Sequence, residues 1–200
     1  MKLYGSFTSP YVRRVRALSH VLHINNRMEW IPASPYESPQ LLLDVNPLSR
    51  IPTLITDEGQ IIPDSAVIAD YLCANFNGEQ YLPVAGEYRW QILHLATLAE
   101  GIIDLALDTV MIRRRNTGDT EKLLRHQQGI ERTLQYLATN QWVLSAEKPT
   151  FYEITLGCAL GYLQFRLPDI FAATVPSTLN TWFAAFEAKP FMHDTQPRES

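Results

Sequence analysis

The sequence predicts a mixed α/β domain in residues 1–80, followed by an all-helical domain in residues 87–200. Up to about Asn77, short strand-like runs alternate with helical stripes, whereas beyond it the apolar periodicity is helical almost throughout. Between the two parts, Asn77-Gly78 and Pro83-Val84-Ala85-Gly86 have the composition of a linker. These observations favour two domains of different class.

The first strand and helix follow from the apolar pattern. Lys2-Leu3-Tyr4-Gly5 is typical of a strand, and apolar residues then recur at helical spacing, at Val12, Val15, Leu18 and Leu22. Ser9 and Pro10 stand where this helix begins, because Ser is a favoured N-cap and Pro is tolerated in the first turn. The free N–H groups of a first helical turn would stabilise a thiolate. This segment by itself favours capping as the whole role of Ser9.

Two later segments have a similar character. Arg50-Ile51-Pro52 precedes the β-rich run Thr53-Leu54-Ile55, and a proline there favours a tight turn, in which a cis bond is allowed. Such a turn leaves the N–H and C=O of Ile51 free to pair with an extended ligand. Asp64-Ser65 precedes a second helical stripe, and the amides of a helix start suit a carboxylate. Taken singly, the first segment is equally consistent with an ordinary loop proline, and the second is equally consistent with another helix cap. The stripe consists of Val67, Ile68, Tyr71 and Leu72.

The remaining elements complete the prediction. Glu29-Trp30-Ile31 and Gln60-Ile61-Ile62 are strand-like runs. A long helix opens the second part, with one apolar face made by Ile92, Leu95, Ala96, Ala99, Ile103, Ala106 and Val110. The next helix uses Leu123, Leu124, Ile130, Leu134 and Leu137. Thr150-Phe151-Tyr152-Glu153 is a capping box that starts a further helix.

The order and spacing of these segments resemble the glutathione transferases over nearly the full chain. The resemblance is carried by Ser9-Pro10-Tyr11-x-Arg13-x-x-Arg16, by Asn46-Pro47-x-x-Arg50-Ile51-Pro52-Thr53-Leu54, and by Asp64-Ser65 before Ile68-x-x-Tyr71-Leu72. It implies a thioredoxin-like first domain and the all-helical second domain of that family. It leaves the specific class open.

The resemblance also implies a site for glutathione as co-substrate. Ser9 matches the catalytic Ser or Cys that meets the glutathione sulfur in the bacterial, zeta-like and omega-like classes. Ile51, with cis-Pro52, matches the residue whose backbone pairs with the cysteinyl part of glutathione. Asp64 and Ser65 match the pair that holds the γ-glutamyl end, and Arg50 lies near the glycyl end. The implied reaction conjugates glutathione to a small apolar electrophile, and the implied assembly is a homodimer.

Three other functions remain open. A thiol–disulfide reductase is typical of relatives with Cys at the Ser9 position, and Ser argues against it. A zeta-like isomerase carries a Ser-Ser-Cys run where this chain has Ser6-Phe7-Thr8-Ser9. A glutathione-binding or protein-interaction module with little turnover would keep the same binding residues. The sequence supports binding better than any particular reaction.

Composition excludes several classes of partner. A hydrophobic content of 46% with 19% charged residues predicts a folded globular protein. The net charge of -4 provides no basic field for nucleic acid, and no apolar run reaches bilayer length, so we expect neither nucleic acid nor a membrane as partner. Met1-Lys2 leads into a strand and not into the apolar core of a signal peptide, so we expect a cytoplasmic protein.

Other reactive and charged residues receive structural assignments. Cys73 and Cys158 lie within helical apolar patterns and are predicted to be buried thiols. The five histidines show no metal-ligand spacing, so no metal site is predicted. The group Arg13, Arg14 and Arg16 is assigned to surface and interface charge.

Overall fold

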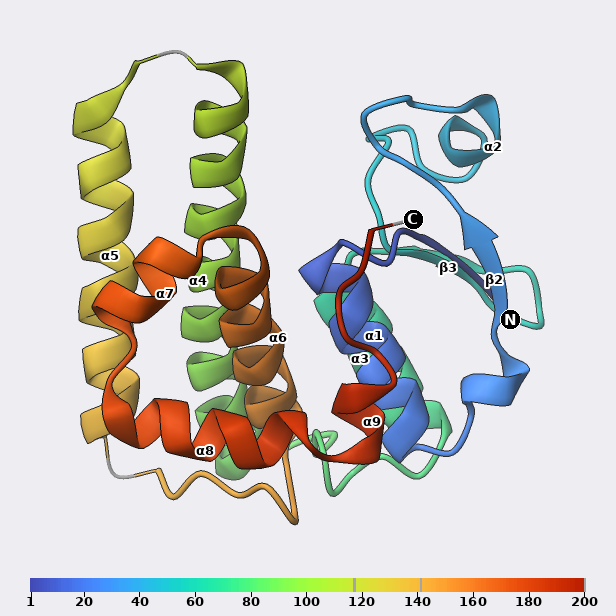
Figure 1. The fold of residues 1–200 in the computed structure, drawn as a ribbon. Coiled ribbons are helices and arrows are strands. Elements are labelled where there is room, and N and C mark those ends of the chain that lie inside the picture. Colours follow the sequence, from blue (N-terminus) through green and yellow to red (C-terminus); the bar gives the residue numbers. More distant parts are fainter. Residues whose placement is uncertain (117, 141, 200) are drawn as a thin grey trace. The chain divides into compact units, whose positions relative to one another are not determined.

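The computed structural model describes residues 1–116, 118–140 and 142–199, which form two compact units (Figure 1). One unit comprises Met1–Arg89 together with residues 193–199, and the other comprises residues 90–192 as far as the structure describes them. The first unit contains a four-stranded sheet with helices, and the second unit is helical. The predicted fold class, α/β followed by all-α, is confirmed.

The first unit begins with a parallel β-α-β arrangement. Strand β1 (Lys2–Gly5) is followed by helix α1 (Pro10–Val21), the short 3-10 helix η1 (Asn25–Arg27) and strand β2 (Glu29–Pro32). Strand β2 pairs parallel with β1, which requires the crossover that α1 provides. Each of these strands and α1 lies where the apolar pattern predicts it.

The second half of this unit completes the sheet. Strands β3 (Thr53–Ile55) and β4 (Ile61–Pro63) pair antiparallel, and β3 also pairs antiparallel with β1, so the strand order is β2-β1-β3-β4. Helix α3 (Ser65–Asn75) follows β4 directly, and its buried face includes Ile68 and Leu72, whereas Val67 of the predicted stripe is 54% exposed.

One short helix was not predicted. Helix α2 (Gln40–Leu43) lies between β2 and β3 in the chain, and only Leu42 of its residues is buried, with Leu41 and Leu43 exposed. A single helical turn with one buried residue has no apolar stripe, so helical periodicity cannot predict it.

The register of the sheet brings three strand ends to one edge. Tyr4 of β1 pairs with Thr53 of β3, and Thr53 pairs in turn with Pro63 of β4. Strand β1 ends at this edge, β3 begins there and β4 ends there. The three segments predicted to bind a ligand therefore all leave the sheet at the same edge.

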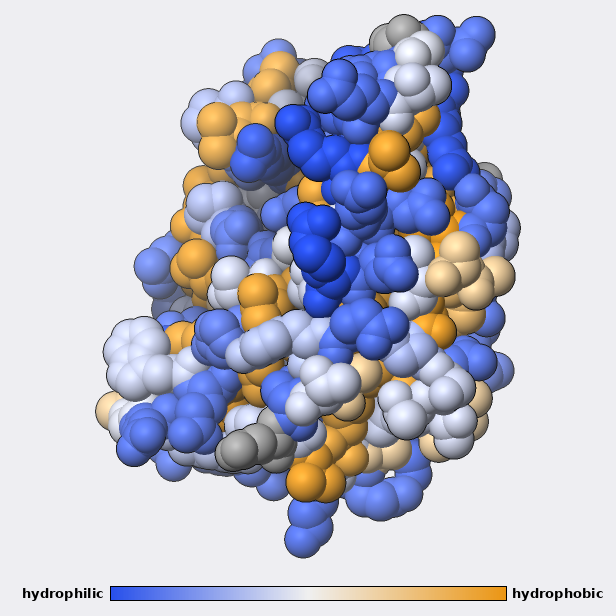
Figure 2. All heavy atoms as spheres, turned by 90° about the vertical axis from the view of Figure 1, so that its left-hand side faces the viewer, coloured by the Kyte–Doolittle hydropathy of each residue, from blue (hydrophilic) through white to orange (hydrophobic). Residues whose placement is uncertain are grey.

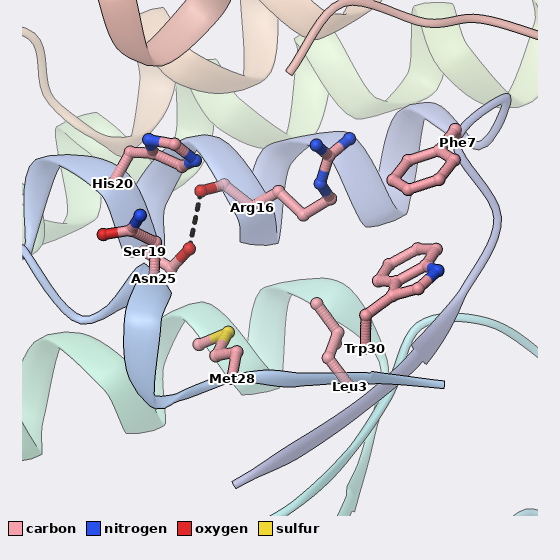
Figure 3. A pocket seen from close by; sticks show the side chains of 8 residues that line it. All are labelled: Leu3, Phe7, Arg16, Ser19, His20, Asn25, Met28 and Trp30. Carbon is pink, nitrogen blue, oxygen red and sulfur yellow. Dashed lines mark hydrogen bonds between the residues drawn. The ribbon is translucent and has the colours of Figure 1, made fainter. Parts of the chain in front are cut away.

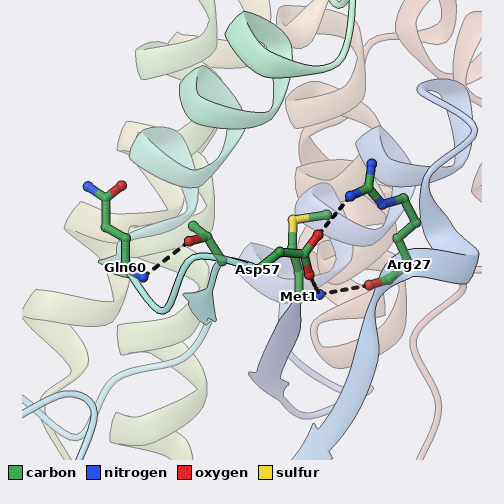
Figure 4. A network of polar contacts seen from close by, with 5 residues as sticks. Met1, Arg27, Asp57 and Gln60 are labelled. Carbon is green, nitrogen blue, oxygen red and sulfur yellow. Dashed lines mark hydrogen bonds and ion pairs between the residues drawn. The ribbon is translucent and has the colours of Figure 1, made fainter.

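A polar network holds the opposite edge of the sheet (Figure 4). The Met1 ammonium and the Arg27 guanidinium both contact the carboxylate of Asp57, with Arg27 Nη2 2.7 Å from Asp57 Oδ2. The Gln60 N–H donates to Thr56 Oγ1 at 3.1 Å. Hydrogen bonds from the Met1 ammonium and from Arg27 lower the pKa of the Asp57 carboxyl. This carboxylate thus stabilises the edge of the sheet that lies opposite the predicted ligand segments.

The second unit is built from long helices. It contains most of α4 (Glu87–Arg115), followed by α5 (Thr120–Thr139), α6 (Phe151–Arg166), α7 (Pro168–Thr174), α8 (Ser177–Glu187) and most of α9 (Pro190–His193). The predicted apolar face of α4 is buried along its length. Helix α5 is amphipathic, and Figure 2 shows mostly hydrophilic side chains over the face that carries it. No helix of residues 1–116, 118–140 and 142–199 combines the length and apolar character needed to cross a membrane.

Helix α6 confirms the predicted capping box. The Tyr152 N–H donates to Thr150 Oγ1 at 3.2 Å, and the Thr150 N–H donates to Glu153 Oε2 at 2.8 Å. All residues from Phe151 to Leu163 are buried. The box therefore satisfies backbone donors at a helix start that water does not reach.

Glycine at position 5 allows α1 to approach β1 closely. A Cβ atom on Gly5 would lie 2.7 Å and 2.9 Å from the two methyl carbons of Val12, which is fully buried. We therefore expect Gly5→Ala to lower the free energy of unfolding by about 1–3 kcal/mol, as overpacking typically does. Urea unfolding, read as a change in midpoint at constant slope, measures this.

Gly101 provides the matched control. A Cβ atom there would have no atom within 4 Å, and Gly101 lies inside α4. Gly101→Ala should therefore raise the free energy of unfolding by about 0.5–1 kcal/mol, the difference in helix propensity. Equal effects at the two positions would contradict the close approach of α1 to β1.

Candidate functional site

Ser9 is the N-cap of α1. Its backbone is extended, with φ -79° and ψ 123°, and its Oγ accepts a hydrogen bond from the Val12 N–H at 3.3 Å. That distance is long for an N–H···O bond, so the cap is weak. The hydroxyl proton takes no part in this bond and can be donated. Ser9 is half-buried, so its capping role leaves it able to contact a ligand.

Ile51 offers its main chain at the start of β3. The Ile51–Pro52 peptide bond is cis, as predicted. The buried Asn46 holds this turn, donating through Nδ2 to the Arg50 carbonyl at 3.1 Å and to Thr53 Oγ1 at 3.0 Å. The Arg50 carbonyl is therefore occupied, whereas the N–H and C=O of Ile51 have no hydrogen-bond partner among the residues that the structure describes. The side chain of Arg50 is exposed.

Asp64 caps α3 from an unusual backbone conformation. Its φ of 73° and ψ of 132° lie outside the left-handed helical region, which is a strained conformation for any residue with a side chain. Oδ1 accepts from the Ala66 N–H at 2.7 Å and from the Val67 N–H at 3.2 Å. The side chain is exposed, and within the described part of the chain Oδ2 has no hydrogen-bond partner. One carboxylate oxygen thus serves the helix and the other faces solvent.

Ser65 accepts hydrogen bonds from a buried arginine. The Ser65 Oγ accepts hydrogen bonds from Arg14 Nε at 3.0 Å and from Arg14 Nη2 at 2.6 Å. Arg14 is 0% exposed and Ser65 is 2% exposed. These bonds join the first helix to the start of the third, across 51 residues of sequence.

The assignment of Arg13 and Arg14 to surface charge was wrong. Arg13 is 1% exposed and Arg14 is 0% exposed, while Arg16 is half-exposed. A signal for this was present in the sequence, because Arg14 precedes Ala17 and Leu18 by three and four residues and so lies on the apolar face of α1. The position of Arg14 on the helix is more informative than its charge.

Together these residues offer groups whose chemistry suits an anionic, extended molecule. The N-termini of α1 and α3 both lie at the sheet edge where β1 and β4 end, so each helix directs its partial positive charge there. The open main chain of Ile51 lies at the same edge, where β3 begins. The structure thus brings Ser9, Arg50, Ile51, Asp64 and Ser65 to one edge of the sheet.

Neither cysteine belongs to this group of residues. Cys73 and Cys158 are both buried thiols, as predicted. Burial raises the pKa of the Cys73 thiol to about 12, so it stays protonated at neutral pH.

A separate hollow lies between α1 and β2 (Figure 3). It has a volume of about 200 Å³, and the rings of Phe7 and Trp30 stack beside it with centroids 4.6 Å apart. The guanidinium of Arg16 lies 4.7 Å from the Phe7 ring centroid. None of the five predicted site residues lines this hollow. Its lining consists of Leu3, Phe7, Arg16, Ser19, His20, Asn25, Met28 and Trp30.

The chain is similar to known glutathione transferases. Residues 3–80 match the family model for the N-terminal domain of glutathione S-transferases. The chain is 32% identical over 170 residues to the uncharacterized GST-like protein YibF of Escherichia coli K12, covering 83% of each protein. A glutathione transferase family member from Pseudomonas fluorescens Pf-5, solved with bound glutathione, superposes with a TM-score of 0.90, 32% identity and 99% coverage of both chains. A glutathione S-transferase from Methylobacillus flagellatus KT, with glutathione bound, superposes with a TM-score of 0.85 and 29% identity, covering 98% of this chain and 99% of its own.

Proposed function

Because this chain belongs to the glutathione transferase family, we propose that it binds glutathione at the shared edge of its sheet and transfers it to a small apolar electrophile. One observation carries the proposal: two helix N-termini and the unpaired main chain of Ile51 lie at the same sheet edge. Glutathione is an extended peptide with two carboxylates and a thiol, which is the chemistry that this edge can accept.

Each group of glutathione has a counterpart at the site. The Oδ2 of Asp64 suits the γ-glutamyl ammonium, and the N–H and O–H of Ser65 suit its carboxylate. The main chain of Ile51 pairs with the cysteinyl residue. The exposed guanidinium of Arg50 suits the glycyl carboxylate.

Ser9 then activates the sulfur. A cysteine-like thiol has a pKa near ~8.5, so only a small fraction is thiolate at neutral pH. The Ser9 hydroxyl donates a hydrogen bond to the sulfur, and the α1 N-terminus adds its field, which lowers the thiol pKa by about 1–2 units. The thiolate electron pair forms a sulfur–carbon bond to the electrophile, which expels its leaving group or takes up a proton. Ser9 is not the nucleophile, because a serine hydroxyl that no neighbouring base deprotonates is too weak an acid.

Two alternative functions differ from the proposed transferase in what the residue at position 9 must do. A thiol–disulfide reductase needs a protein sulfur at the start of α1, but Ser9 stands there and both cysteines are buried. A glutathione-binding protein without turnover shares every contact except thiol activation, so a direct assay of conjugation distinguishes it from a transferase. That assay tests aryl halides, epoxides and enones in turn with glutathione, and a separate assay tests peroxides, which the thiol would reduce without forming a conjugate.

Asp64→Asn tests glutathione binding without disturbing the helix start. Asparagine caps a helix as well as aspartate does, so the free energy of unfolding should change by less than about 0.5 kcal/mol. Loss of the negative charge opposite the γ-glutamyl ammonium should weaken glutathione binding by about 1.5–3 kcal/mol, or roughly tenfold to a hundredfold. Isothermal titration calorimetry measures the glutathione affinity of the unsubstituted protein and of Asp64→Asn.

Asp57→Asn is the control for this experiment, because Asp57 is a carboxylate at the opposite edge of the same sheet. It should leave glutathione affinity unchanged. Failure of the unsubstituted protein to bind glutathione at millimolar concentration would refute the proposed function.

Ser9→Ala tests the chemical step. Glutathione affinity should stay nearly the same, while the pKa of the bound thiol rises and the conjugation rate at neutral pH falls by roughly 10- to 100-fold, since about 1.4–2.7 kcal/mol of thiolate stabilisation is lost. Thiolate absorbance followed against pH reports the pKa directly. An unchanged pKa and rate would reduce Ser9 to a helix cap.

We further propose that the chain forms a homodimer, in which the first domain of one subunit meets the long helix of the other. Exposed apolar side chains support this, since Val67 on α3 is 54% exposed and Trp90 on α4 is 67% exposed. Sedimentation equilibrium at micromolar concentration should give twice the 22.8 kDa of one chain. Trp90→Asp should yield single chains, whereas Val143→Asp, at a residue 87% exposed, should not. A single-chain mass for the unsubstituted protein would contradict the proposal.

A further inference from the structure

We propose that Arg14 is a positioning residue for the ligand's γ-glutamyl carboxylate, because its buried guanidinium compels the Ser65 hydroxyl to act as a donor. The inference rests on the proposed function and adds to it a residue that does not itself touch glutathione. It assigns a role to a buried charge that the glutathione contacts leave unexplained.

The two hydrogen bonds from Arg14 decide the state of Ser65. A serine hydroxyl has one proton and two acceptor lone pairs. Arg14 Nε and Nη2 lie 3.0 Å and 2.6 Å from Ser65 Oγ, so both lone pairs are used. An arginine has no acceptor, so the direction of these bonds cannot reverse. The only remaining capacity of Ser65 Oγ is to donate its proton.

That proton lacks an acceptor within residues 1–116, 118–140 and 142–199. Arg14 provides the only side-chain hydrogen bonds of Ser65 there, and Ser65 is 2% exposed, so bulk water is a poor substitute. A buried donor left without an acceptor is costly. The Ser65 N–H, at the first position of α3, is also outside the hydrogen bonds of the described residues. Two adjacent donors at a helix N-terminus form a two-pronged receptor for a carboxylate.

Asp64 makes this receptor selective for an α-amino acid group. Its Oδ1 caps α3 while Oδ2 is open, so an acceptor of positive charge lies one residue from two donors. An ammonium and a carboxylate on one carbon match this arrangement in one orientation. Arg14 strengthens the selectivity, because a donor bonded to a charged group polarises the next bond in the chain.

The experiment compares two probes on the full chain. One is glutathione, and the other is 4-aminobutanoyl-cysteinylglycine, which keeps the ammonium, thiol and glycyl carboxylate but lacks the α-carboxylate. Calorimetry should show the unsubstituted protein binding glutathione about tenfold to a hundredfold more tightly than the analogue, the range for a hydrogen bond to a charged group. Arg14→Lys and Ser65→Ala should each abolish most of this preference and leave the affinity for the analogue unchanged.

A double variant tests whether Arg14 acts on glutathione affinity through Ser65. Because Arg14 acts through Ser65, the double variant Arg14→Lys/Ser65→Ala should bind glutathione no more weakly than Ser65→Ala alone. Arg27→Lys, at an exposed arginine of the same unit, is the matched control and should keep the full preference. Retention of the preference in Arg14→Lys, or an equal loss of affinity for both probes, would overturn the inference.

A measurement on the unsubstituted protein covers the case in which Arg14→Lys does not fold. The Nε–Hε signal of Arg14 in a nitrogen-15 spectrum should shift when glutathione is added and stay in place when the analogue is added. The same response to both probes would overturn the inference. Absence of glutathione binding would overturn the proposed function as well, whereas binding with an unchanged Arg14 signal would overturn this inference alone.

Discussion

The geometry of the site depends on one row of apolar side chains across the sheet. Leu3 pairs with Leu54, and Leu54 pairs with Ile62, and all three are buried, at 1%, 0% and 5% exposure. Because side chains alternate between the faces of a strand, a slip of one residue in β3 would turn Leu54 toward the other face. This apolar row therefore sets the register, and the register places the start of β3 beside the ends of β1 and β4. The positions of Ser9, Ile51 and Asp64 are consequences of that row.

The polar part of the site is assembled on this frame at some cost. Asp64 is held at a φ of 73°, and the charge of Arg14 is removed from water. Strained backbone and buried charge persist only where surrounding contacts compensate for them. Here Asp64 caps two amides of α3, and Arg14 donates two hydrogen bonds to Ser65. These contacts hold the residues at the sheet edge in place.

A fold whose register depends on apolar pattern can persist while much of the sequence changes. The protein from Pseudomonas fluorescens superposes with a TM-score of 0.90 at 32% identity. Apolar residues of similar size can replace one another in a core without changing register, since volume and pattern matter more than identity.

The sequence by itself determined the elements that local rules control. The helix starts at Ser9, Asp64 and Thr150 follow from capping chemistry, and the strands and the long α4 follow from apolar periodicity. The place of Arg14 on the apolar face of α1 can be read from the sequence, but only the tertiary structure decided its bonds to Ser65, which lies 51 residues further along the chain. A capping residue is recognised by its immediate neighbours, so the sequence suffices. A buried guanidinium is stabilised only by a partner that folding brings to it, so its pairing becomes visible only when the two helices pack together.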